Sequence, residues 1–456
     1  MSDLKLDVRL DSRLNGQSYA HPVGNLTKSS DGLIQFVYTT EYLDYPSAIP
    51  LSMSLPLTEK LFSEQQAKPF FANLLQERDQ PIRRVVERFN VDANDIVGLL
   101  FYLGAECAGA VSVLPEGAPP TKAPGNPNTD YAAISPEQME NLVLALHRRE
   151  PLPLNSVDNS PLSGYQSKIS LRCLANGTYA LAREGTGAPT THVLKVPDSS
   201  HLQDAQREHL SLKLSHMCRL GSVHSECKSI AGIECLITTR FDRAIGERGF
   251  IHRIHQEDFA QALALPPSLK YQRYGAGSRI FNAEAVTRVL AQTISPPTAT
   301  LGFIRATLFD LLVGNADAHA KNHALVYMDN KRSRPSLRYD ILPTRLDDTI
   351  SAELPFYIGT AKQFEDVGQQ AFSIFLNSLG INSTRGQLRV IAESLDAILP
   401  TLAENLDTLQ SINQKSFADL IAANMRQLLP KLGYPVPKEA QERDANVVRG
   451  GGWLTS

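Results

Sequence analysis

The stretch GNADAHAKN, residues 314–322, lies between two apolar segments, LFDLLVG at 308–314 and HALVYM at 323–328. The first apolar segment is typical of a helix and the second of a strand, so the polar residues should form a loop held by two rigid elements. Loops of this kind often carry function. A helix end followed by a turn would explain the glycine and part of the polar character. It would not explain why Asp, His, Lys and Asn crowd into six residues.

The polar loop has the residue types and the spacing of a phosphoryl-transfer site. Asp317 precedes Asn322 by five residues, as the aspartate precedes the asparagine in kinase catalytic loops. We expect 323–328 and 336–341 to pair as an antiparallel hairpin, which would bring Asn322 beside Asp340. An amide oxygen and a carboxylate close together suit Mg²⁺, whose remaining positions phosphates can fill. Asp317 could then accept the proton of an attacking hydroxyl group.

A metal hydrolase is the alternative for this segment. His319 and His323 have the HxxxH spacing of zinc-binding helices. The glutamate that normally follows the first histidine is missing, and the segment after the second is expected to be a strand. Zinc hydrolysis is therefore the weaker interpretation.

A lysine lies in the middle of another predicted strand, THVLKVP at 191–197. Lys195 could point into water from an edge strand. Alternatively it could contact phosphates and pair with an acid on the next helix, where Glu208 is the candidate. The turn at 163–168, SGYQSK, could cover phosphates with its backbone N–H groups, although a single glycine makes it weak support.

The composition is that of a globular protein. The chain has 456 residues, 42% hydrophobic and 20% charged, which is enough for about three domains with cores of their own. A net charge of −3 argues against a protein that binds nucleic acid unaided. Five scattered cysteines without a CxxC pair argue against a disulfide framework and a cysteine zinc site. Because no apolar segment resembles a signal peptide or a membrane span, we expect a cytoplasmic protein without membrane contacts.

Pattern and composition divide the chain into five regions. Residues 1–113 should form a small antiparallel sheet with helices. The strands of this sheet are expected at 3–10, 33–38, 99–103 and 107–113. Residues 114–136 contain six prolines and should form a linker. Residues 137–248 should hold a twisted sheet with one helix, 249–436 should be mainly helical, and 437–456 should be a flexible tail.

The linker ends at a helix start. Ser135 is a candidate N-cap, Pro136 suits the first helical position, and Gln138 completes a capping box. The following region is then expected to open with a helix.

Ten segments, in chain order from about residue 3 to 430, resemble the HipA family, the serine/threonine kinase toxins of bacterial toxin–antitoxin pairs. The segments are MSLPL (53–57), PFFANLLQE (69–77), GAECAGAVSVLP (104–115), SGYQSKISL (163–171), THVLKVP (191–197), RFDR (240–243), IHQEDFAQAL (254–263), KYQ (270–272), GNADAHAKN (314–322) and RYDILPT (338–344). The GNADAHAKN loop is the most specific of them, and their shared order makes coincidence a poor explanation.

The resemblance implies an α+β fold with two lobes, similar to phosphoinositide-3/4-kinases more than to ordinary protein kinases. The N-terminal lobe would be a mixed β-rich, ATP-covering lobe and the C-terminal lobe mainly helical. Asp317 would be the catalytic aspartate, and Asn322 and Asp340 would hold Mg²⁺. Lys195 would contact the ATP phosphates, the backbone from Thr239 to Phe241 would bind the adenine, and His319 and Tyr339 would lie at the nucleotide. The sequence itself adds Ser163, Gly164, Gln166 and Lys168 of the turn and Glu208 of the helix as candidate ATP-site residues.

The phosphate-covering loop departs from the family at one position. HipA toxins can silence themselves by phosphorylating a serine three residues before the loop glycine, and here that position is Pro161. Ser160 and Ser163 flank it and are the candidates for autophosphorylation.

The resemblance also implies partners. These are a helix-turn-helix antitoxin like HipB, operator DNA reached through the antitoxin complex, and a protein substrate such as an aminoacyl-tRNA synthetase. The activity would be ATP-dependent phosphorylation of serine or threonine, combined with co-repression of the operon. The alternative is a catalytically silent HipA-like co-repressor, against which the complete set of Lys195, Asp317, Asn322 and Asp340 counts.

Overall fold

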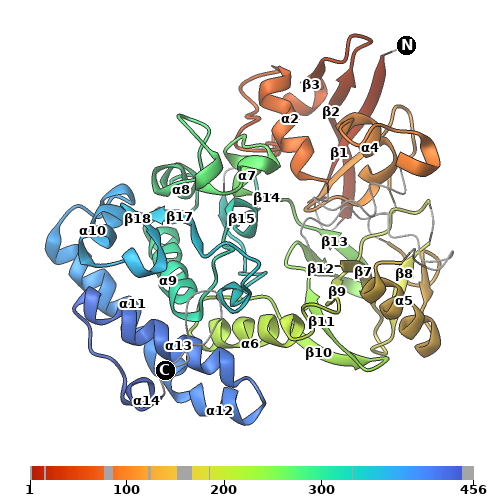
Figure 1. The fold of residues 1–456 in the computed structure, drawn as a ribbon. Coiled ribbons are helices and arrows are strands. Elements are labelled where there is room, and N and C mark those ends of the chain that lie inside the picture. The colour runs from red at the N-terminus through yellow and green to blue at the C-terminus, as the bar shows by residue number, and fades with distance from the viewer. Residues whose placement is uncertain are drawn as a thin grey trace. The chain divides into compact units, whose positions relative to one another are not determined.

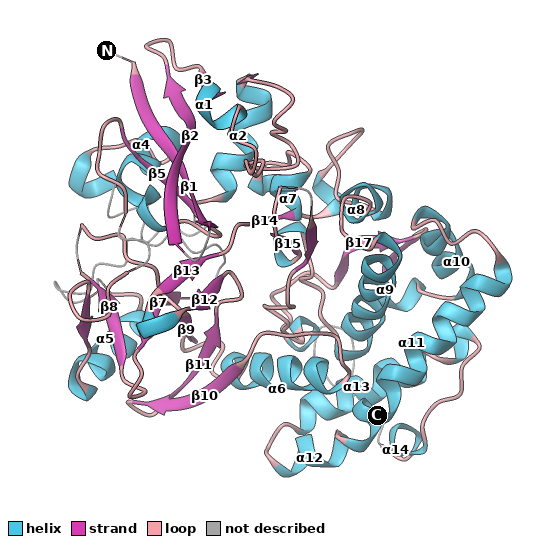
Figure 2. Cartoon of the chain, turned by 180° about the vertical axis from the view of Figure 1, so that it is seen from behind, coloured by secondary structure: helices cyan, strands magenta, loops and turns pink. Residues whose placement is uncertain are grey.

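The computed structural model describes residues 3–14, 17–75, 86–121, 125–150, 152, 167–183, 185–330 and 332–443 (Figure 1). The chain forms two compact units. Unit 1 comprises residues 1–205, 225–268 and 324–336, and unit 2 comprises 206–224, 269–323 and 337–456. Figure 2 shows that strands gather in unit 1 and helices in unit 2. The predicted α+β class is therefore confirmed.

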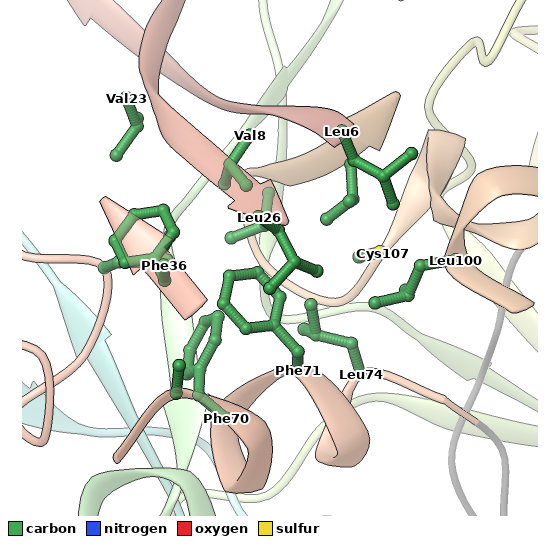
Figure 3. Close-up of a cluster of buried hydrophobic side chains, with 14 of the residues drawn as sticks. Leu6, Val8, Val23, Leu26, Phe36, Phe70, Phe71, Leu74, Leu100 and Cys107 are labelled. Atoms are coloured by element: carbon green, nitrogen blue, oxygen red, sulfur yellow. The ribbon is translucent and has the colours of Figure 1, made fainter. Parts of the chain in front are cut away.

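Unit 1 begins with a five-stranded antiparallel sheet in the order β4-β3-β2-β1-β5. Its strands are β1 (Leu4–Leu14), β2 (Gln17–Lys28), β3 (Ile34–Tyr38), β4 (Leu61–Phe62) and β5 (Val111–Pro115). Alternate residues of β1 are apolar, so one face of the strand is buried. The helices of this part are α1 (Thr40–Leu43), α2 (Glu64–Asn73) and α4 (Ile96–Leu103). Figure 3 shows Leu26 of the sheet facing Phe71 of α2 in the shared core.

The predicted strand at 99–103 is wrong, because these residues belong to helix α4. The side chain of Asp95 accepts a hydrogen bond of 3.1 Å from the N–H of Gly98 and so starts the helix. A short, continuously apolar run fits a buried helix as well as a buried strand, and periodicity alone cannot separate them. Only the cap before the run distinguishes the two.

The second sheet of unit 1 has six antiparallel strands in the order β10-β11-β9-β7-β8-β6. They are β6 (Tyr131–Ala133), β7 (Ser167–Cys173), β8 (Tyr179–Ala182), β9 (His192–Val196), β10 (Ser225–Ile230) and β11 (Ile233–Thr239). Helix α5 (Pro136–Arg148) starts with the predicted capping box, since Ser135 and Gln138 each accept the other's backbone N–H at 3.1 and 2.9 Å. Its apolar side, including Val143, packs on this sheet.

Two smaller sheets complete unit 1. One pairs β12 (Arg243–Ile245) with β13 (Ile251–Arg253), and the other has the order β14-β15-β16. The strands of the second are β14 (Gln256–Asp258), β15 (Ala324–Tyr327) and β16 (Ser333–Pro335), and helix α7 (Phe259–Ala262) follows β14.

The predicted hairpin between 323–328 and 336–341 is therefore wrong in its second strand. Strand β15 pairs with 333–335 instead. Residues 336–341 contain only an isolated bridge between Arg338 and Ser222. The backbone at Asp340 has a φ of 57°, which no β-strand accommodates.

Unit 2 is mainly helical. It contains most of α6 (Asp204–Met217), followed by α8 (Ala283–Leu290), α9 (Pro296–Val313), α10 (Gln369–Ser378), α11 (Thr384–Glu404), α12 (Leu406–Ser411), α13 (Lys415–Leu428) and α14 (Lys438–Gln441). A hairpin of β17 (Glu353–Ile358) and β18 (Ala361–Gln363) lies among them. Across the described part of the chain, no helix combines the length and apolar character that crossing a membrane requires. The predicted tail at 437–456 falls outside the described residues from 444 onward.

A buried glutamate joins three distant segments of unit 1. Glu257 is 0% exposed and accepts hydrogen bonds from Ser52 Oγ at 2.5 Å, from the N–H of Met53 at 3.0 Å and from Tyr327 Oη at 2.5 Å. Burial raises the pKa of the Glu257 carboxyl to about 7, against the lowering effect of these donors. The folded protein therefore keeps the proton of this carboxyl to a higher pH than the unfolded chain does.

This pKa predicts a pH-dependent contribution to stability. Between pH 4.5 and about 7 the folded Glu257 keeps a proton that the unfolded chain has released, so its contribution to stability falls as the pH rises. Glu257→Gln fixes the neutral form. The stability of the variant relative to the wild type should therefore increase by about 3 kcal/mol between pH 4.5 and 8.

Urea denaturation at a series of pH values measures this difference. His255 and His323, whose pKa values burial lowers to about 4, contribute the opposite slope in both proteins and cancel. The exposed Glu234→Gln serves as the control and should show no such trend. A pH-independent difference for Glu257→Gln would contradict the prediction.

Candidate active site

The predicted catalytic loop starts where helix α9 ends. Gly314 adopts a left-handed conformation with a φ of 79°, and its N–H and that of Asn315 both donate to the carbonyl oxygen of Asp310 at 2.9 Å. A Cβ atom at Gly314 would lie 2.7 Å from Leu420 Cδ2. A glycine is needed here for both its φ and its lack of a side chain.

The loop is held by its own polar side chains. Asn315 Oδ1 accepts the N–H of Asp317 at 3.0 Å, and Asn315 Nδ2 donates to Asp310 Oδ1 at 3.1 Å. Asn322 Nδ2 donates to the carbonyl oxygen of Asp317 at 2.8 Å. This bond assigns the nitrogen of the Asn322 amide to the loop and leaves the amide oxygen as the atom that a cation would use.

Asp317 is the partly exposed acid of this loop, with 35% of its side chain accessible. Its Oδ1 accepts a hydrogen bond from the phenol of Tyr271, and His319 Nε2 lies 3.9 Å from the same oxygen. The Tyr271 and His319 rings meet edge to face at 5.1 Å. A carboxylate that is oriented on one side and reachable from solvent is suited to accept a proton from a substrate.

The segment that carries Asp340 is tied to the loop by two contacts. Tyr339 Oη donates to the carbonyl oxygen of Lys321 at 2.8 Å. Arg338 donates from Nη2 to both carboxylate oxygens of Asp310 at 2.6 Å. The first contact takes the place of the predicted hairpin in joining the neighbours of Asn322 to the neighbours of Asp340, and the second ties the same segment to helix α9.

The donor set of Asn322 and Asp340 fits Mg²⁺ better than a transition metal. It offers one amide oxygen and one carboxylate, so phosphates and water would supply the other ligands. Among the described residues, no group of three or more His, Cys, Asp and Glu side chains is placed to hold a metal.

The HxxxH spacing of His319 and His323 has a structural explanation. His323 Nε2 lies 3.2 Å from the carbonyl oxygen of Ala318, and its ring packs against Phe281 and Phe303. Burial lowers the pKa of His323 to about 4. This residue is a neutral core histidine, which counts against the zinc interpretation.

Lys195 lies in the centre of the six-stranded sheet of unit 1. Strand β9 runs between β11 and β7, and Lys195 is only 9% exposed, so the edge-strand interpretation is wrong. In the ladder Lys195 stands directly opposite Lys168 of β7. Two lysines paired across neighbouring strands repel each other unless an anion or an acid lies near them. Two of the predicted phosphate-binding residues thus occupy adjacent positions.

The other predicted ATP contacts are placed as follows. Thr239 ends β11, opposite His192 of β9, and Phe241 follows two residues later. Glu208 lies in α6 and is 1% exposed. Its pairing with Lys195 stays a prediction. Ser160, Pro161, Ser163, Gly164 and Gln166 lie outside the described residues.

The RFDR motif belongs to a network of buried charges in unit 1. Arg240 donates to both carboxylate oxygens of Asp242 at 3.0 and 2.9 Å. Arg243 Nη2 lies 3.0 Å from Glu106 Oε1, and the N–H of Gly109 donates to Asp242 at 2.7 Å. Despite burial, the arginines hold the pKa values of Glu106 and Asp242 below their usual range. The motif thus fixes the residues around Thr239 and Phe241 against the N-terminal part of the unit.

Sequence analysis quoted the segments that contain Asp310, Arg338 and Tyr271 but assigned no role to these residues. A signal for the first existed in LFDLLV, where one aspartate interrupts an apolar helix and has to find a buried partner. The identity of that partner, 28 residues later, depends on the tertiary structure.

Comparison with known proteins identifies the family. The profile described as the HipA-like C-terminal domain matches residues 160–402, and the profile described as the HipA N-terminal domain matches residues 16–114. The chain belongs to the HipA family.

Among its relatives is Y4mE of Sinorhizobium fredii, whose name is that of a kinase. It is 31% identical over 408 residues, which cover 89% of this chain and 95% of the relative. The serine/threonine-protein kinase toxin HipA of Shewanella oneidensis is 26% identical over 79% of this chain and 84% of its own length.

The fold is that of a solved HipA structure. The Shewanella oneidensis HipA chain, determined in a complex of HipA, HipB and operator DNA, matches with a TM-score of 0.73 at 22% identity. The match covers 96% of this chain and 100% of that one. The fold expected from the resemblance is confirmed.

The buried pair of Asp310 and Arg338 predicts a large loss of stability on mutation. Arg338→Met leaves the Asp310 carboxylate buried without its main partner, and burial already raises the pKa of that carboxyl. The variant should lose about 3–5 kcal/mol of unfolding free energy in urea denaturation. The matched control is Arg332→Met, whose partner is Asp329 at 2.6 Å on the surface, and it should lose less than about 1 kcal/mol. Equal losses would contradict the account.

Proposed function

We propose that this protein is an ATP-dependent serine/threonine protein kinase that acts as the toxin of a HipA/HipB-like pair. The observation that carries the proposal is the loop at 314–322. It presents Asp317 partly exposed and fixes the amide of Asn322 through the Asp317 carbonyl.

In the proposed reaction, Asp317 accepts the proton of a serine or threonine hydroxyl while the hydroxyl oxygen forms a bond to the γ-phosphorus of ATP. The bond from that phosphorus to the β–γ bridging oxygen breaks, and ADP leaves. Asn322 and Asp340 would hold Mg²⁺, which would neutralise charge on the phosphates. Tyr271 orients the Asp317 carboxylate through its phenol. His319 and Tyr339 are proposed to lie at the nucleotide.

Of the proposed ATP contacts, Lys195, Lys168 and Thr239 lie on the six-stranded sheet of unit 1. Lys195 and the opposing Lys168 supply positive charge for the phosphates. The backbone from Thr239 to Phe241 binds the adenine, with Ser163, Gly164 and Gln166 covering the phosphates. Glu208 is the proposed acid partner of Lys195. Autophosphorylation would fall on Ser160 or Ser163.

The proposed partners follow from the relatives. A helix-turn-helix antitoxin would bring the protein to operator DNA, by analogy with the solved Shewanella oneidensis complex of HipA, HipB and operator DNA. The net charge of −3 is consistent with DNA binding that depends on the antitoxin. We propose an aminoacyl-tRNA synthetase as the substrate class and the cytoplasm as the location. A catalytically silent co-repressor is the alternative.

The role of Asp317 is tested by Asp317→Asn. The amide keeps an acceptor for Tyr271 but cannot take a proton, so transfer of radiolabelled phosphate from Mg-ATP to aminoacyl-tRNA synthetases and to the chain itself should fall about 100-fold or more. The melting temperature should change little, because Asp317 is partly exposed. Asp329→Asn, on the surface, is the control. Wild-type activity in Asp317→Asn would refute the assignment, and an inactive wild type that binds antitoxin would favour the silent co-repressor.

The role of Lys195 is tested by nucleotide binding. Lys195→Met removes a buried positive charge from the centre of the sheet, so titration calorimetry should show an affinity for Mg-ATP that is lower by about tenfold or more. Lys228→Met, on the exposed edge strand β10, should bind Mg-ATP as the wild type does. Unchanged affinity in a folded Lys195→Met protein would contradict the assignment.

A further inference from the structure

We infer that Arg273 selects protein substrates that carry acidic side chains next to the hydroxyl to be phosphorylated. The inference rests on the proposed kinase activity and adds the substrate class. It concerns residues 270–274, KYQRY, which we call the aromatic–cation platform.

The platform is attached to the catalytic loop at several points. The N–H of Ala320 donates to the carbonyl oxygen of Lys270 at 3.0 Å, and the phenol of Tyr271 donates to Asp317. Gln272 Oε1 accepts the N–H of Tyr357 in β17 at 2.7 Å, which anchors the other side of the segment. A substrate that places its hydroxyl group at Asp317 would therefore have the aromatic–cation platform beside that group.

Arg273 is held in place by rings. Its guanidinium carbon lies 4.1 Å from the centre of the Tyr271 ring and 5.1 Å from that of Tyr274, which is itself 59% exposed. Tyr271 thus contacts the proposed base through its hydroxyl group and Arg273 through its face. The guanidinium is one side chain away from Asp317.

Within the described part of the chain this arginine forms no ion pair; it stacks on the two tyrosine rings, and its charge also acts on Tyr357. Its Nη1 is shielded from solvent and has no acceptor there. Arg273 is half-buried and its Nε and Nη2 are not shielded in this way, so a carboxylate from a second molecule can approach the guanidinium from that side. Stacking on aromatic rings fixes the plane of the guanidinium and prepares it for such a bidentate contact.

The surrounding charges favour an acidic partner. Lys270 lies 5.5 Å from the Tyr271 ring and Lys362 lies 5.3 Å from the Tyr357 ring, so both add positive charge. The nearby Glu353 accepts a hydrogen bond from Tyr357 Oη at 2.8 Å and is already engaged. The other anion that could use Arg273 is a phosphate of ATP, and the experiment separates the two.

The test uses two fluorescent peptides with one central serine, identical except for three Glu or three Lys residues on each side of it. Their affinities are measured by fluorescence anisotropy with Mg-ADP present, and phosphate transfer is measured with Mg-ATP. The proteins are the wild type, Arg273→Glu and the control Arg279→Glu, which changes an exposed arginine of the same loop.

The wild type should bind the Glu peptide at least about tenfold more tightly than the Lys peptide. Arg273→Glu should reverse this order and raise KM for the Glu peptide while KM for ATP stays unchanged. Arg279→Glu should keep the wild-type preference. Because binding is read separately, absence of transfer with the preference intact would refute the kinase proposal, whereas transfer without the preference would refute this inference alone.

Three results would overturn the inference. The wild type could bind both peptides equally, Arg279→Glu could have the same effect as Arg273→Glu, or Arg273→Glu could raise KM for ATP and leave peptide binding unchanged. The last result would assign Arg273 to the nucleotide.

Discussion

The pairing of Asp310 with Arg338 is the constraint on which the candidate catalytic loop of unit 2 depends. The carbonyl oxygen of Asp310 receives the N–H groups that end helix α9, and its carboxylate receives both Asn315 and the guanidinium of Arg338. One buried residue thereby fixes where the loop at 314–322 begins and where the segment with Asp340 runs. A buried charge pair gives little net stability but permits few alternative arrangements. In this protein that restriction keeps the acid of the loop and the proposed metal ligands in one arrangement.

In unit 1 a larger set of buried charges likewise fixes the position of a segment of the chain. Arg240, Asp242, Arg243 and Glu106 are all buried and bonded to one another or to the backbone. Because removal of any one of them would strand a partner in a low-dielectric interior, the segment after β11 has a single favourable position. The backbone proposed to bind adenine is the start of that segment. Positioning by buried ion pairs is thus common to both units.

The sequence was sufficient for the fold class and for most elements with strong local signals. The capping box at Ser135 is observed, and the strand predicted at 191–197 is observed within a residue of its bounds. Local sequence signals did not predict the structure of segments whose conformation depends on contacts with distant residues. Residues 99–103 read equally well as strand or helix, and 336–341 has an alternating pattern but is held by Arg338 and a positive φ at Asp340. The loop at 314–322 was recognisable because it concentrates residue types that take part in catalysis and metal binding. Tyr271 and Asp317 are 46 residues apart, so no local sequence pattern predicts their contact.

The central claim is that Asn322 and Asp340 bind the Mg²⁺ ion of the phosphates whose transfer Asp317 assists by accepting the proton of the substrate. A crystal structure with Mn²⁺ and a non-hydrolysable ATP analogue tests it most directly, because the anomalous signal of manganese locates the ion without reference to the protein. The account predicts an ion coordinated by Asn322 Oδ1, a carboxylate oxygen of Asp340 and phosphate oxygens, with the γ-phosphate facing Asp317. An ion bound away from both residues, or a γ-phosphate turned away from Asp317, would contradict it.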